Sequence, residues 1–259
     1  GQSLAQLVAE KASPVADVTY LGVTFGIQAR KEGVVTAYKP AAWNDIPNGL
    51  KDPEGHWFTI HSGTLGFMVN VDALKGKPIP RSWADLLKPE YKGEIQVANP
   101  ASSGTAYTIL AGLVQIMGED KAFDYMKKLH RNIGQYTRSG TGPIKAVARG
   151  ETSVSISFVH DGPGEKMQGF PVETVTPSEG TGAEIGSMSL IKGARNLDQA
   201  KKFYEWALTA SAQEMGAASK QFQLPSNKSQ PPYRLWTPFL LAANGPSPRA
   251  SASCMVFLQ

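Results

Sequence analysis

Short apolar strands alternate with helical segments along most of this chain, and no other feature of the sequence constrains the fold as strongly. The helical stretches between expected strands are about 8 to 13 residues long. Because a helix of that length carries a chain back to the start of a parallel neighbour, the pattern predicts an α/β fold with mainly parallel sheets flanked by helices. We expect strands at residues 17–21, 57–61, 67–70, 94–98, 153–159, 172–176 and 187–191, and helices at 1–10, 25–31, 82–87, 105–117, 120–130, 143–149, 197–208 and 211–218.

Composition excludes several classes of protein. The 259 residues are 41% hydrophobic and include 26 glycines, which indicates a globular chain. The net charge of +4 is not concentrated in any segment, so the charge pattern does not indicate a nucleic-acid partner. The single cysteine, Cys254, excludes an internal disulfide and a cysteine-rich metal site. The longest apolar runs, such as 109–114, are far shorter than the roughly 20 residues of a membrane span.

Both ends of the chain are unusual for such a fold. Residues 1–10 have the pattern of the middle or end of a helix, with no strand before them. We therefore expect that an N-terminal segment is missing, and a signal peptide would have belonged to that segment. Residues 231–259 are rich in proline and have no sustained period. Two interpretations stay open for them: an arm packed over a core, or a stretch foreign to the natural protein.

Two segments at helix starts carry short hydroxyl side chains next to glycine. Sheets of α/β proteins place ligands where a strand ends and the next helix begins. The segment 99–105 (NPASSGT) would direct unpaired amides and the positive helix end toward an anion. Ordinary helix capping by Ser102 or Ser103 is the alternative. The segment 138–143 (RSGTGP) has the same combination of hydroxyl side chains and glycine before an expected helix. Two such turns favour a shared anion pocket.

Two further segments carry carboxylates. His160 and Asp161 follow the strand expected at 153–159. Neighbouring residues of a strand point to opposite faces, so the pair cannot form a catalytic dyad within the strand, but on the turn beyond it both could bind hydroxyls. A helix cap by Asp161 is the alternative. The segment 179–184 (EGTGAE) suits a hinge, a hydroxyl-binding loop or a solvated loop.

Linear motifs of common enzymes are absent from the sequence. The patterns GxGxxG, GxxxxGK[ST], GxSxG and HExxH do not occur. We therefore predict no catalytic residue, no cofactor and no metal site. The tryptophans at positions 43, 57, 83 and 206 are interpreted as packing residues.

The order of six motifs resembles a known family. The chain contains DVTYLG, WFTIHSGTLGFMVN, SWADLLKPEYKGEIQVANPASSGTAYT, SGTGPIKAVARGE, SISFVHDG and SLIKGARN. Together they resemble the periplasmic solute-binding proteins of ABC importers, in the branch that includes ferric-ion-binding proteins, with the type II bilobed fold. The resemblance covers about residues 1–230.

The resemblance implies two α/β lobes joined by two crossing segments, with the ligand in the cleft. Residues 1–87 and 186–259 would form one lobe, lacking its N-terminal strand and with an atypical stretch at 231–259. Residues 88–185 would form the other, with hinge crossings near 78–93 and 176–186.

The resemblance also bears on the ligand. Ferric-binding members carry adjacent tyrosines where this chain has His160 and Asp161, and the nearest tyrosine downstream is Tyr204. A His-Asp pair followed by a distant glutamate, here Glu184, resembles the sugar-phosphate-binding subgroup. His160, Asp161 and Glu184 would then take sugar hydroxyls, at the opposite end from the phosphate. The phosphate would be held by Ser102, Ser103, Gly104, Thr105, Ser139, Thr141 and Gly142.

The function implied by the resemblance is transport. The chain would be a periplasmic, monomeric and non-enzymatic binding protein that delivers a phosphorylated sugar or similar organophosphate to the membrane permease of an ABC importer. Binding of Fe(III) with an anion, or of a phosphonate, is the alternative within the class. A phosphate-ester hydrolase that uses His160 and Asp161 is the alternative from another class, and a sensory role also stays open.

Overall fold

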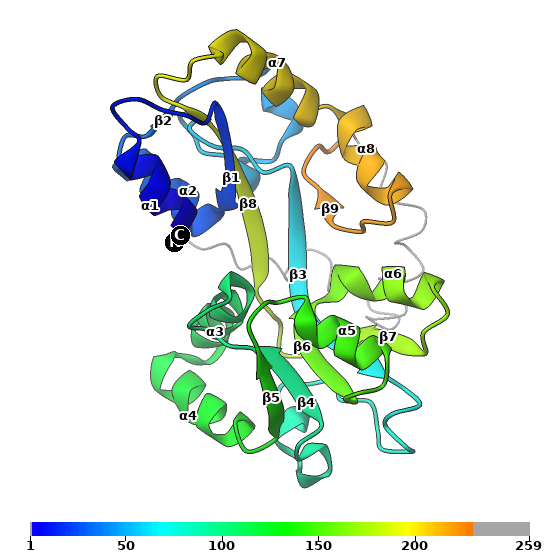
Figure 1. Cartoon of the computed structure of the whole chain (residues 1–259). Coiled ribbons are helices and arrows are strands. Elements are labelled where there is room, and N and C mark those ends of the chain that lie inside the picture. Colours follow the sequence, from blue (N-terminus) through cyan, green and yellow to red (C-terminus); the bar gives the residue numbers. More distant parts are fainter. Residues whose placement is uncertain (1, 230–259) are drawn as a thin grey trace. The chain divides into compact units, whose positions relative to one another are not determined.

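The computed structural model describes residues 2–229, which divide into two compact units (Figure 1). Unit 1 comprises residues 2–62 and 185–229 of the described chain, and unit 2 comprises residues 63–184. The atypical stretch at 231–259 lies outside the described residues. None of the described helices is both long enough and apolar enough to cross a membrane.

Unit 1 contains a small antiparallel sheet. Its strand β1 and the short β2 both pair with β8 in antiparallel register, and β9 pairs with the first residues of β3. The elements of unit 1 are α1 (Gln2–Ala9), β1 (Val18–Gly22), α2 (Val23–Lys31), β2 (Val35–Thr36), the 3-10 turns η1 (Ala41–Asp45) and η2 (Asn48–Leu50), most of β8 (Ala183–Ile191), α7 (Leu197–Ala207), α8 (Ala210–Ala218) and β9 (Leu224–Pro225).

Apolar side chains cover both faces of the unit 1 sheet. Alternate residues of a strand point to opposite faces. Accordingly, Met188 and Leu190 of β8 belong to a cluster with the buried Tyr204 of α7. Ile191 instead belongs to a cluster with Leu7 of α1.

Unit 2 contains a five-stranded mixed sheet in the order β7-β3-β6-β4-β5. Strand β3 is antiparallel to β6 and β7, whereas β4 is parallel to β5 and β6. The elements of unit 2 are most of β3 (His61–Asn70), η3 (Asp85–Leu87), η4 (Pro89–Tyr91), β4 (Ile95–Ala98), α3 (Gly104–Met117), α4 (Glu119–Leu129), β5 (Ile133–Thr137), α5 (Gly142–Ala148), β6 (Val154–Phe158), η5 (Val159–Asp161), α6 (Gly162–Met167) and β7 (Val172–Val175).

The unit 2 sheet is also covered on both faces. Phe67 of β3 belongs to the larger cluster, together with Leu113 of α3 and Leu129 of α4. The next residue, Met68, points to the other face and packs with Ile144 of α5. Two other strands of this sheet lead into the segments of interest: β4 into α3, and β6 into η5.

The expected mainly parallel sheets are wrong in part. All pairings described within unit 1 are antiparallel, and unit 2 has two parallel and two antiparallel pairings. The helices α3 and α4 do connect the parallel strands β4 and β5, as the pattern predicts. Strands β1 and β8 lie far apart in the sequence, so the length of a single connection does not determine their direction.

The first boundary between the units lies between residues 62 and 63, whereas the sequence analysis expected the chain to cross between lobes near residues 78–93. Residues 65–70 pair with β6 and β7, and Leu74, Trp83 and Leu86 are buried in the unit 2 core. The segment 63–87 therefore belongs to unit 2, not to the lobe that begins at residue 1. The second boundary, at 184/185, lies inside the expected range of 176–186.

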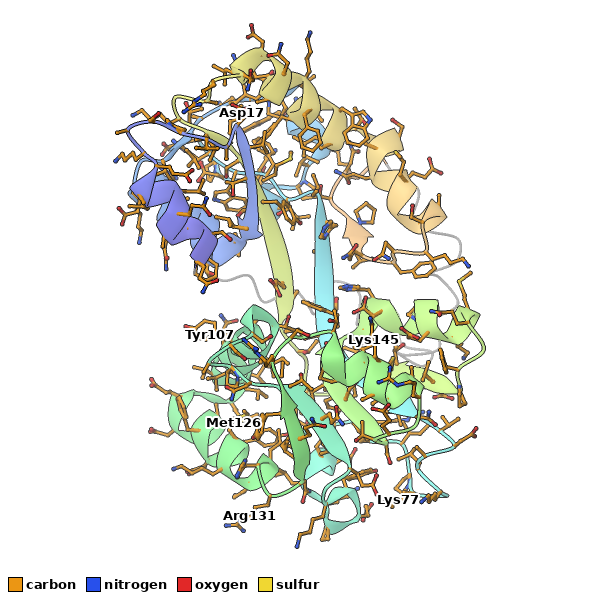
Figure 2. The ribbon with its side chains drawn as sticks, in the orientation of Figure 1. Asp17, Lys77, Tyr107, Met126, Arg131 and Lys145 are labelled. Carbon is orange, nitrogen blue, oxygen red and sulfur yellow. The ribbon has the colours of Figure 1, made fainter. Side chains whose placement is uncertain are left out.

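Several local predictions need correction as well. Strand β3 includes the strand expected at 67–70 but begins six residues earlier, and of the strand expected at 57–61 only residue 61 belongs to it. The short helix expected at 82–87 is the 3-10 turn η3. The nearly all-apolar sequence of residues 105–117 predicts a helix buried on all sides, but α3 has an exposed side on which Tyr107 is 58% exposed (Figure 2). Trp206, expected to pack, is 50% exposed. Strand β5 and helix α6 were not predicted.

Candidate functional site

Two hydroxyl-bearing segments of unit 2 lie against each other. The amide of Asn99 donates to the carbonyl of Thr137 at 2.8 Å, and Ser102 Oγ donates to the carbonyl of Arg138 at 3.1 Å. Gly140 leaves room for Thr105, because a Cβ on Gly140 would lie 2.5 Å from Thr105 Oγ1. The starts of α3 and α5 therefore lie next to each other, and the shared anion pocket between them stays a prediction.

Ser103 has the ordinary capping role that the sequence analysis left open. Its Oγ accepts a hydrogen bond from the Ala106 amide at 3.4 Å, and the residue is 8% exposed. Capping does not use all the donors of a helix start, because the first four amides of a helix have no partner within it. The amides of Gly104 and Thr105 belong to this first turn of the 14-residue helix α3, whose positive end attracts anions.

The segment before α5 is exposed and tied to β6. Ser139 and Thr141 are exposed, and their hydroxyl oxygens lie 3.4 Å apart. Ser157 Oγ donates to the carbonyl of Gly140 at 2.7 Å. This bond joins the segment 139–142 to the strand that leads to His160.

His160 and Asp161 lie on the 3-10 turn η5, directly after β6. On this turn the two side chains lie on the same side, with His160 Nε2 3.6 Å from Asp161 Oδ1. Burial, and next the charge of Glu165, raises the pKa of Asp161 to about 6. Asp161 stands at the N-cap position of α6 but forms no capping hydrogen bond through its side chain. The helix-cap alternative for Asp161 thus has no hydrogen bond to support it.

Glu184 is a second half-buried carboxyl group of unit 2, and its Oε2 atom is buried. Burial raises its pKa, and its Oε2 has no hydrogen-bond partner among residues 2–229. Thr181, three residues earlier, is 3% exposed, and its Oγ1 likewise has no hydrogen-bond partner among residues 2–229. Buried polar atoms are normally hydrogen-bonded, so these atoms are ones that a ligand could satisfy. Thr181 was not predicted, because a threonine in a glycine-rich loop carries no distinctive signal.

Strand β3 connects the Glu184 segment with the His160 turn. The Leu65 amide donates to the carbonyl of Gly182 at 3.0 Å, and Leu65 is opposite Phe158 in the β3–β6 register. A Cβ on Gly182 would touch the Gly112 Cα of α3 at 3.5 Å. All ten predicted residues therefore lie in unit 2, on segments that contact one another: Ser102, Ser103, Gly104, Thr105, Ser139, Thr141, Gly142, His160, Asp161 and Glu184.

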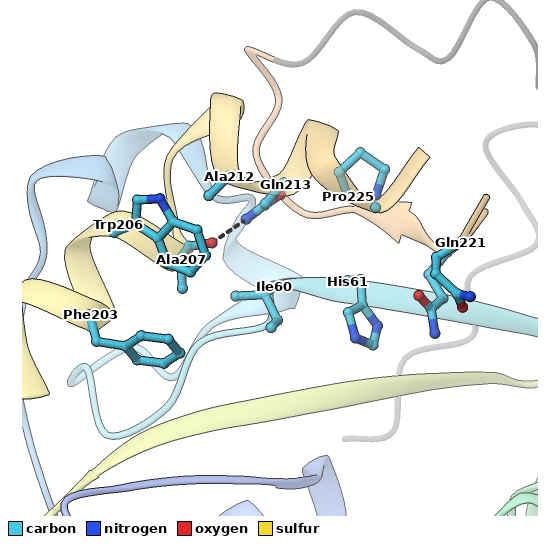
Figure 3. A pocket seen from close by; sticks show the side chains of 11 residues that line it. Ile60, His61, Phe203, Trp206, Ala207, Ala212, Gln213, Gln221 and Pro225 are labelled. Carbon is cyan, nitrogen blue, oxygen red and sulfur yellow. Dashed lines mark hydrogen bonds between the residues drawn. The ribbon is translucent and has the colours of Figure 1, made fainter. Parts of the chain in front are cut away.

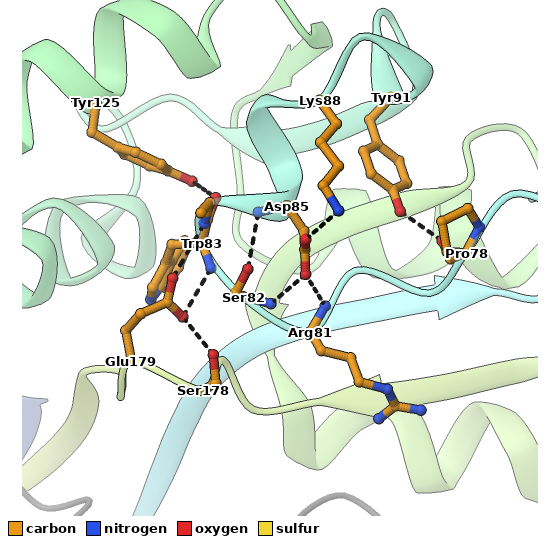
Figure 4. A network of polar contacts seen from close by, with 11 residues as sticks. Pro78, Arg81, Ser82, Trp83, Asp85, Lys88, Tyr91, Tyr125, Ser178 and Glu179 are labelled. Carbon is orange, nitrogen blue, oxygen red and sulfur yellow. Dashed lines mark hydrogen bonds and ion pairs between the residues drawn. The ribbon is translucent and has the colours of Figure 1, made fainter.

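The other carboxylate of the 179–184 segment has a structural role. Glu179 accepts the amides of Trp83 at 3.1 Å and Ala84 at 3.2 Å (Figure 4). Trp83 Nε1 in turn donates to the carbonyl of Gly180 at 2.9 Å. These bonds anchor the loop on which Thr181 and Glu184 follow.

Unit 1 contains a separate cavity of about 180 Å³ (Figure 3). Its lining is largely apolar, and the pKa of His61, one of its few polar residues, is lowered by burial. Such a lining does not suit an anion, and none of the ten predicted residues contributes to it. The lining residues include Ile60, His61, Phe203, Trp206, Gln213, Gln221 and Pro225.

Comparisons with known proteins agree with the motif order. The family model described as bacterial extracellular solute-binding protein matches residues 13–240. A curated protein of Haemophilus influenzae is 45% identical over 224 residues, which are 83% of this chain and 64% of that protein. A probable ABC transporter periplasmic-binding protein of Sinorhizobium fredii is 26% identical over 235 residues, 87% of this chain and 64% of that protein. This chain thus spans 64% of the length of both relatives.

A similar solved structure is that of the periplasmic binding protein AfuA from Actinobacillus pleuropneumoniae, with exogenous fructose-6-phosphate bound. It is 45% identical to this chain, with a TM-score of 0.83, and the match covers 90% of this chain and 76% of AfuA.

Proposed function

This chain belongs to the family of bacterial extracellular solute-binding proteins, and from this premise we propose that it captures a phosphorylated sugar or a similar organophosphate for an ABC importer. The expected α/β fold of type II periplasmic binding proteins is confirmed by the likeness to AfuA. In the proposal, the protein acts as a monomer in the periplasm, delivers its ligand to a membrane permease and catalyses no reaction.

Two half-buried carboxyl groups beside a hydroxyl-rich surface are the observation that carries the proposal. Asp161 and Glu184 are both buried enough to raise their pKa, and Glu184 Oε2 lacks a hydrogen-bond partner within residues 2–229. A buried acceptor without a partner costs free energy that a ligand donor recovers. Sugar hydroxyls are such donors, whereas a phosphate would be repelled by a carboxylate.

The hydroxyl-rich segments 102–105 and 139–142 support the phosphate end. Their short side chains and the first amides of α3 offer many donors in a small space. Helix starts and hydroxyl groups suit phosphate oxygens. The fructose-6-phosphate in the AfuA structure combines this kind of anion with several hydroxyl groups, which makes it a suitable probe.

An aminoalkylphosphonate is the second candidate, because the same two carboxyl groups would accept an ammonium group. Isothermal titration of the full chain with fructose 6-phosphate, inorganic phosphate and 2-aminoethylphosphonate separates the candidates. We expect fructose 6-phosphate to bind more tightly than the other two. Tighter binding of the phosphonate would overturn the sugar assignment.

The hydrolase alternative is tested in the same samples. We expect fructose 6-phosphate to be recovered intact after incubation, with no inorganic phosphate released. Release that disappears in the His160→Asn variant would establish an enzyme and contradict the transport proposal. Native mass spectrometry of the freshly purified chain would identify any ligand retained from the cell.

A further inference from the structure

The imidazole of His160 lies in a narrow seat formed by Gly63 and Phe158. The rings of His160 and Phe158 stack with centroids 4.8 Å apart and planes inclined by 26°. A Cβ on Gly63 would lie 2.6 Å from His160 Cε1 and 3.0 Å from Phe158 Cδ1. Because real Cβ atoms do not approach ring atoms so closely, only glycine fits at position 63 without moving the ring.

The strand register explains why these residues meet. Leu65 is opposite Phe158 in the antiparallel pair of β3 and β6. This is the last pair of the ladder, and Gly63 precedes Leu65 by two residues on β3 while His160 follows Phe158 by two residues on η5, so both lie just beyond it. An aromatic ring that covers a glycine on the neighbouring strand is a known way of pinning register in sheets. The seat is therefore built by the sheet, whereas His160 itself belongs to the turn η5 that follows β6.

We propose that Gly63 and Phe158 are positioning residues, which hold the His160 ring in the orientation that contacts a sugar hydroxyl. The inference rests on the proposed function, because it assigns His160 to the sugar end of the ligand. His160 is 6% exposed, so its ring has little freedom to find another orientation. The specificity of the site for a sugar then depends on a residue of β3 that need not touch the ligand.

The test is the Gly63→Ala variant, with Gly66→Ala as its matched control. Both glycines belong to β3, and a Cβ at either position meets close neighbours. At position 66 those neighbours are the Val175 carbonyl and Val159 Cγ1, with no atom of His160 among the three nearest. The control therefore crowds the strand and the neighbouring residue Val159 of η5, but introduces no direct contact with the His160 ring.

Affinity is measured by calorimetry on the full chain with fructose 6-phosphate and inorganic phosphate. We expect Gly63→Ala to weaken fructose 6-phosphate by about three- to tenfold, the effect of losing one neutral hydrogen bond, and to leave inorganic phosphate unchanged. Gly66→Ala should preserve the ratio of the two affinities. If both variants weaken both ligands equally, the effect belongs to the strand and the proposal is overturned.

A ligand-free readout distinguishes the seat from the proposed function. The Phe158 ring should shift the Cε1 proton resonance of His160, which the His160→Asn variant assigns. Phe158→Leu and Gly63→Ala should each move that resonance toward the position of an exposed histidine, and Gly66→Ala should not. A resonance unaffected by Gly63→Ala would contradict the proposal that Gly63 positions the His160 ring. Failure of the unaltered chain to bind fructose 6-phosphate, with the resonance behaving as expected, would instead overturn the proposed function.

Discussion

At the scale of single residues, three carboxyl groups of unit 2 differ in role because their surroundings differ. Glu179 accepts backbone amides of Trp83 and Ala84 and is thereby committed to the structure. Asp161 and Glu184 are half-buried, and partial burial raises the pKa of each. All three side chains carry a carboxyl group, so the residue type does not distinguish them. Their hydrogen-bond partners and their burial distinguish the structural Glu179 from Asp161 and Glu184, the candidate ligand contacts.

The Asp161→Ala variant tests the sugar end. A hydrogen bond to a charged acceptor contributes about 1.5–3 kcal/mol, so we expect fructose 6-phosphate to bind about ten- to a hundredfold more weakly. Inorganic phosphate should bind almost unchanged, because in the proposal the anion lies at the other end of the ligand. Calorimetric titration of both ligands makes the comparison. Equal weakening of both would mean that Asp161 supports the fold, and no effect on either would remove it from the site.

The pKa of Asp161 also predicts how stability depends on pH. The folded-state pKa of about 6 lies above the ordinary value of 3.8, so between these values the folded chain keeps a proton that the unfolded chain has released. The contribution of protonated Asp161 to the free energy of unfolding is complete below pH 3.8 and is lost as the pH rises through about 6. The difference in pKa corresponds to about 3 kcal/mol. Because the side chain is 28% exposed, solvent screens part of it, and we expect about 1–2 kcal/mol.

Urea unfolding of the unaltered chain and of Asp161→Asn at pH 4 and pH 7 measures this contribution. The free energy of unfolding of the unaltered chain, relative to that of Asp161→Asn, should be smaller at pH 7 than at pH 4. Asp124→Asn, a change at an exposed site on α4, is the control and should show no such trend. A difference that is the same at both pH values would mean that the pKa of Asp161 is not raised.

Residue-level prediction from sequence succeeds where local pattern and chemistry coincide. His160 and Asp161 were noticed because polar residues directly follow an apolar strand. Glu184 was singled out only by the family resemblance, since nothing in its own segment distinguishes it from Glu179. Gly63 was not predicted, because its contact with His160 exists only once β3 and β6 pair. Contacts across a sheet depend on register, which a single sequence does not specify.

At the scale of elements, a strong period of apolar residues was sufficient to predict a helix or strand, and a weak one was not. The helices expected at 105–117 and 120–130 correspond to α3 and α4. Strand β5 was missed because its sequence (IGQYT) has no apolar alternation and none of its residues is fully buried. The first half of strand β3 was missed because Gly63 and Gly66 interrupt its apolar pattern, although both permit the close packing of β3 on η5.

The start of α3 is the element whose role in anion binding is tested by Ser103→Leu. The bulky side chain should fill the space beside the first amides and abolish binding of inorganic phosphate and fructose 6-phosphate. Lys127→Ala, on the exposed face of α4, removes a positive charge and should change either affinity less than twofold. Both ligands are titrated by calorimetry at one salt concentration.

Loss of the N-cap also destabilises α3 by about 1 kcal/mol, so Ser103→Ala is the control for stability. Ser103→Ala should lose similar stability and yet retain phosphate binding, because the amides stay accessible. Equal weakening by Ser103→Leu and Lys127→Ala would show that diffuse charge attracts the anion and that the helix start does not.

At the scale of the whole molecule, the division of the chain was harder to predict than the fold class. Alternating strands and helices indicate an α/β protein, and the resemblance indicates two lobes. The first boundary was placed too late, because the chain passes into unit 2 within β3 and no break in composition marks that point. Only the pairing of β3 with β6 and β7 assigns residues 65–70 to unit 2.

The tyrosines within residues 2–229 also bear on the proposed choice of a sugar phosphate over Fe(III). Fe(III) in this branch of the family needs phenolate oxygens, and His160 and Asp161 stand where the resemblance places adjacent tyrosines. Tyr204 is 1% exposed, its hydroxyl donates to the carbonyl of Met188 at 2.9 Å, and burial raises its pKa. Formation of a phenolate at Tyr204 is therefore unfavourable. The described tyrosines with large exposed surfaces are Tyr20 of unit 1 and Tyr107 of unit 2.

We therefore expect the purified chain to stay colourless when mixed with ferric citrate. Iron bound by phenolate absorbs in the visible region, so the absorption spectrum measures this binding directly, and a ferric-binding protein of the same family is the positive control. Addition of fructose 6-phosphate should leave the spectrum unchanged while releasing the heat of binding. A visible band that disappears in Tyr20→Phe or Tyr107→Phe would show that iron is a ligand and would overturn the sugar-phosphate assignment.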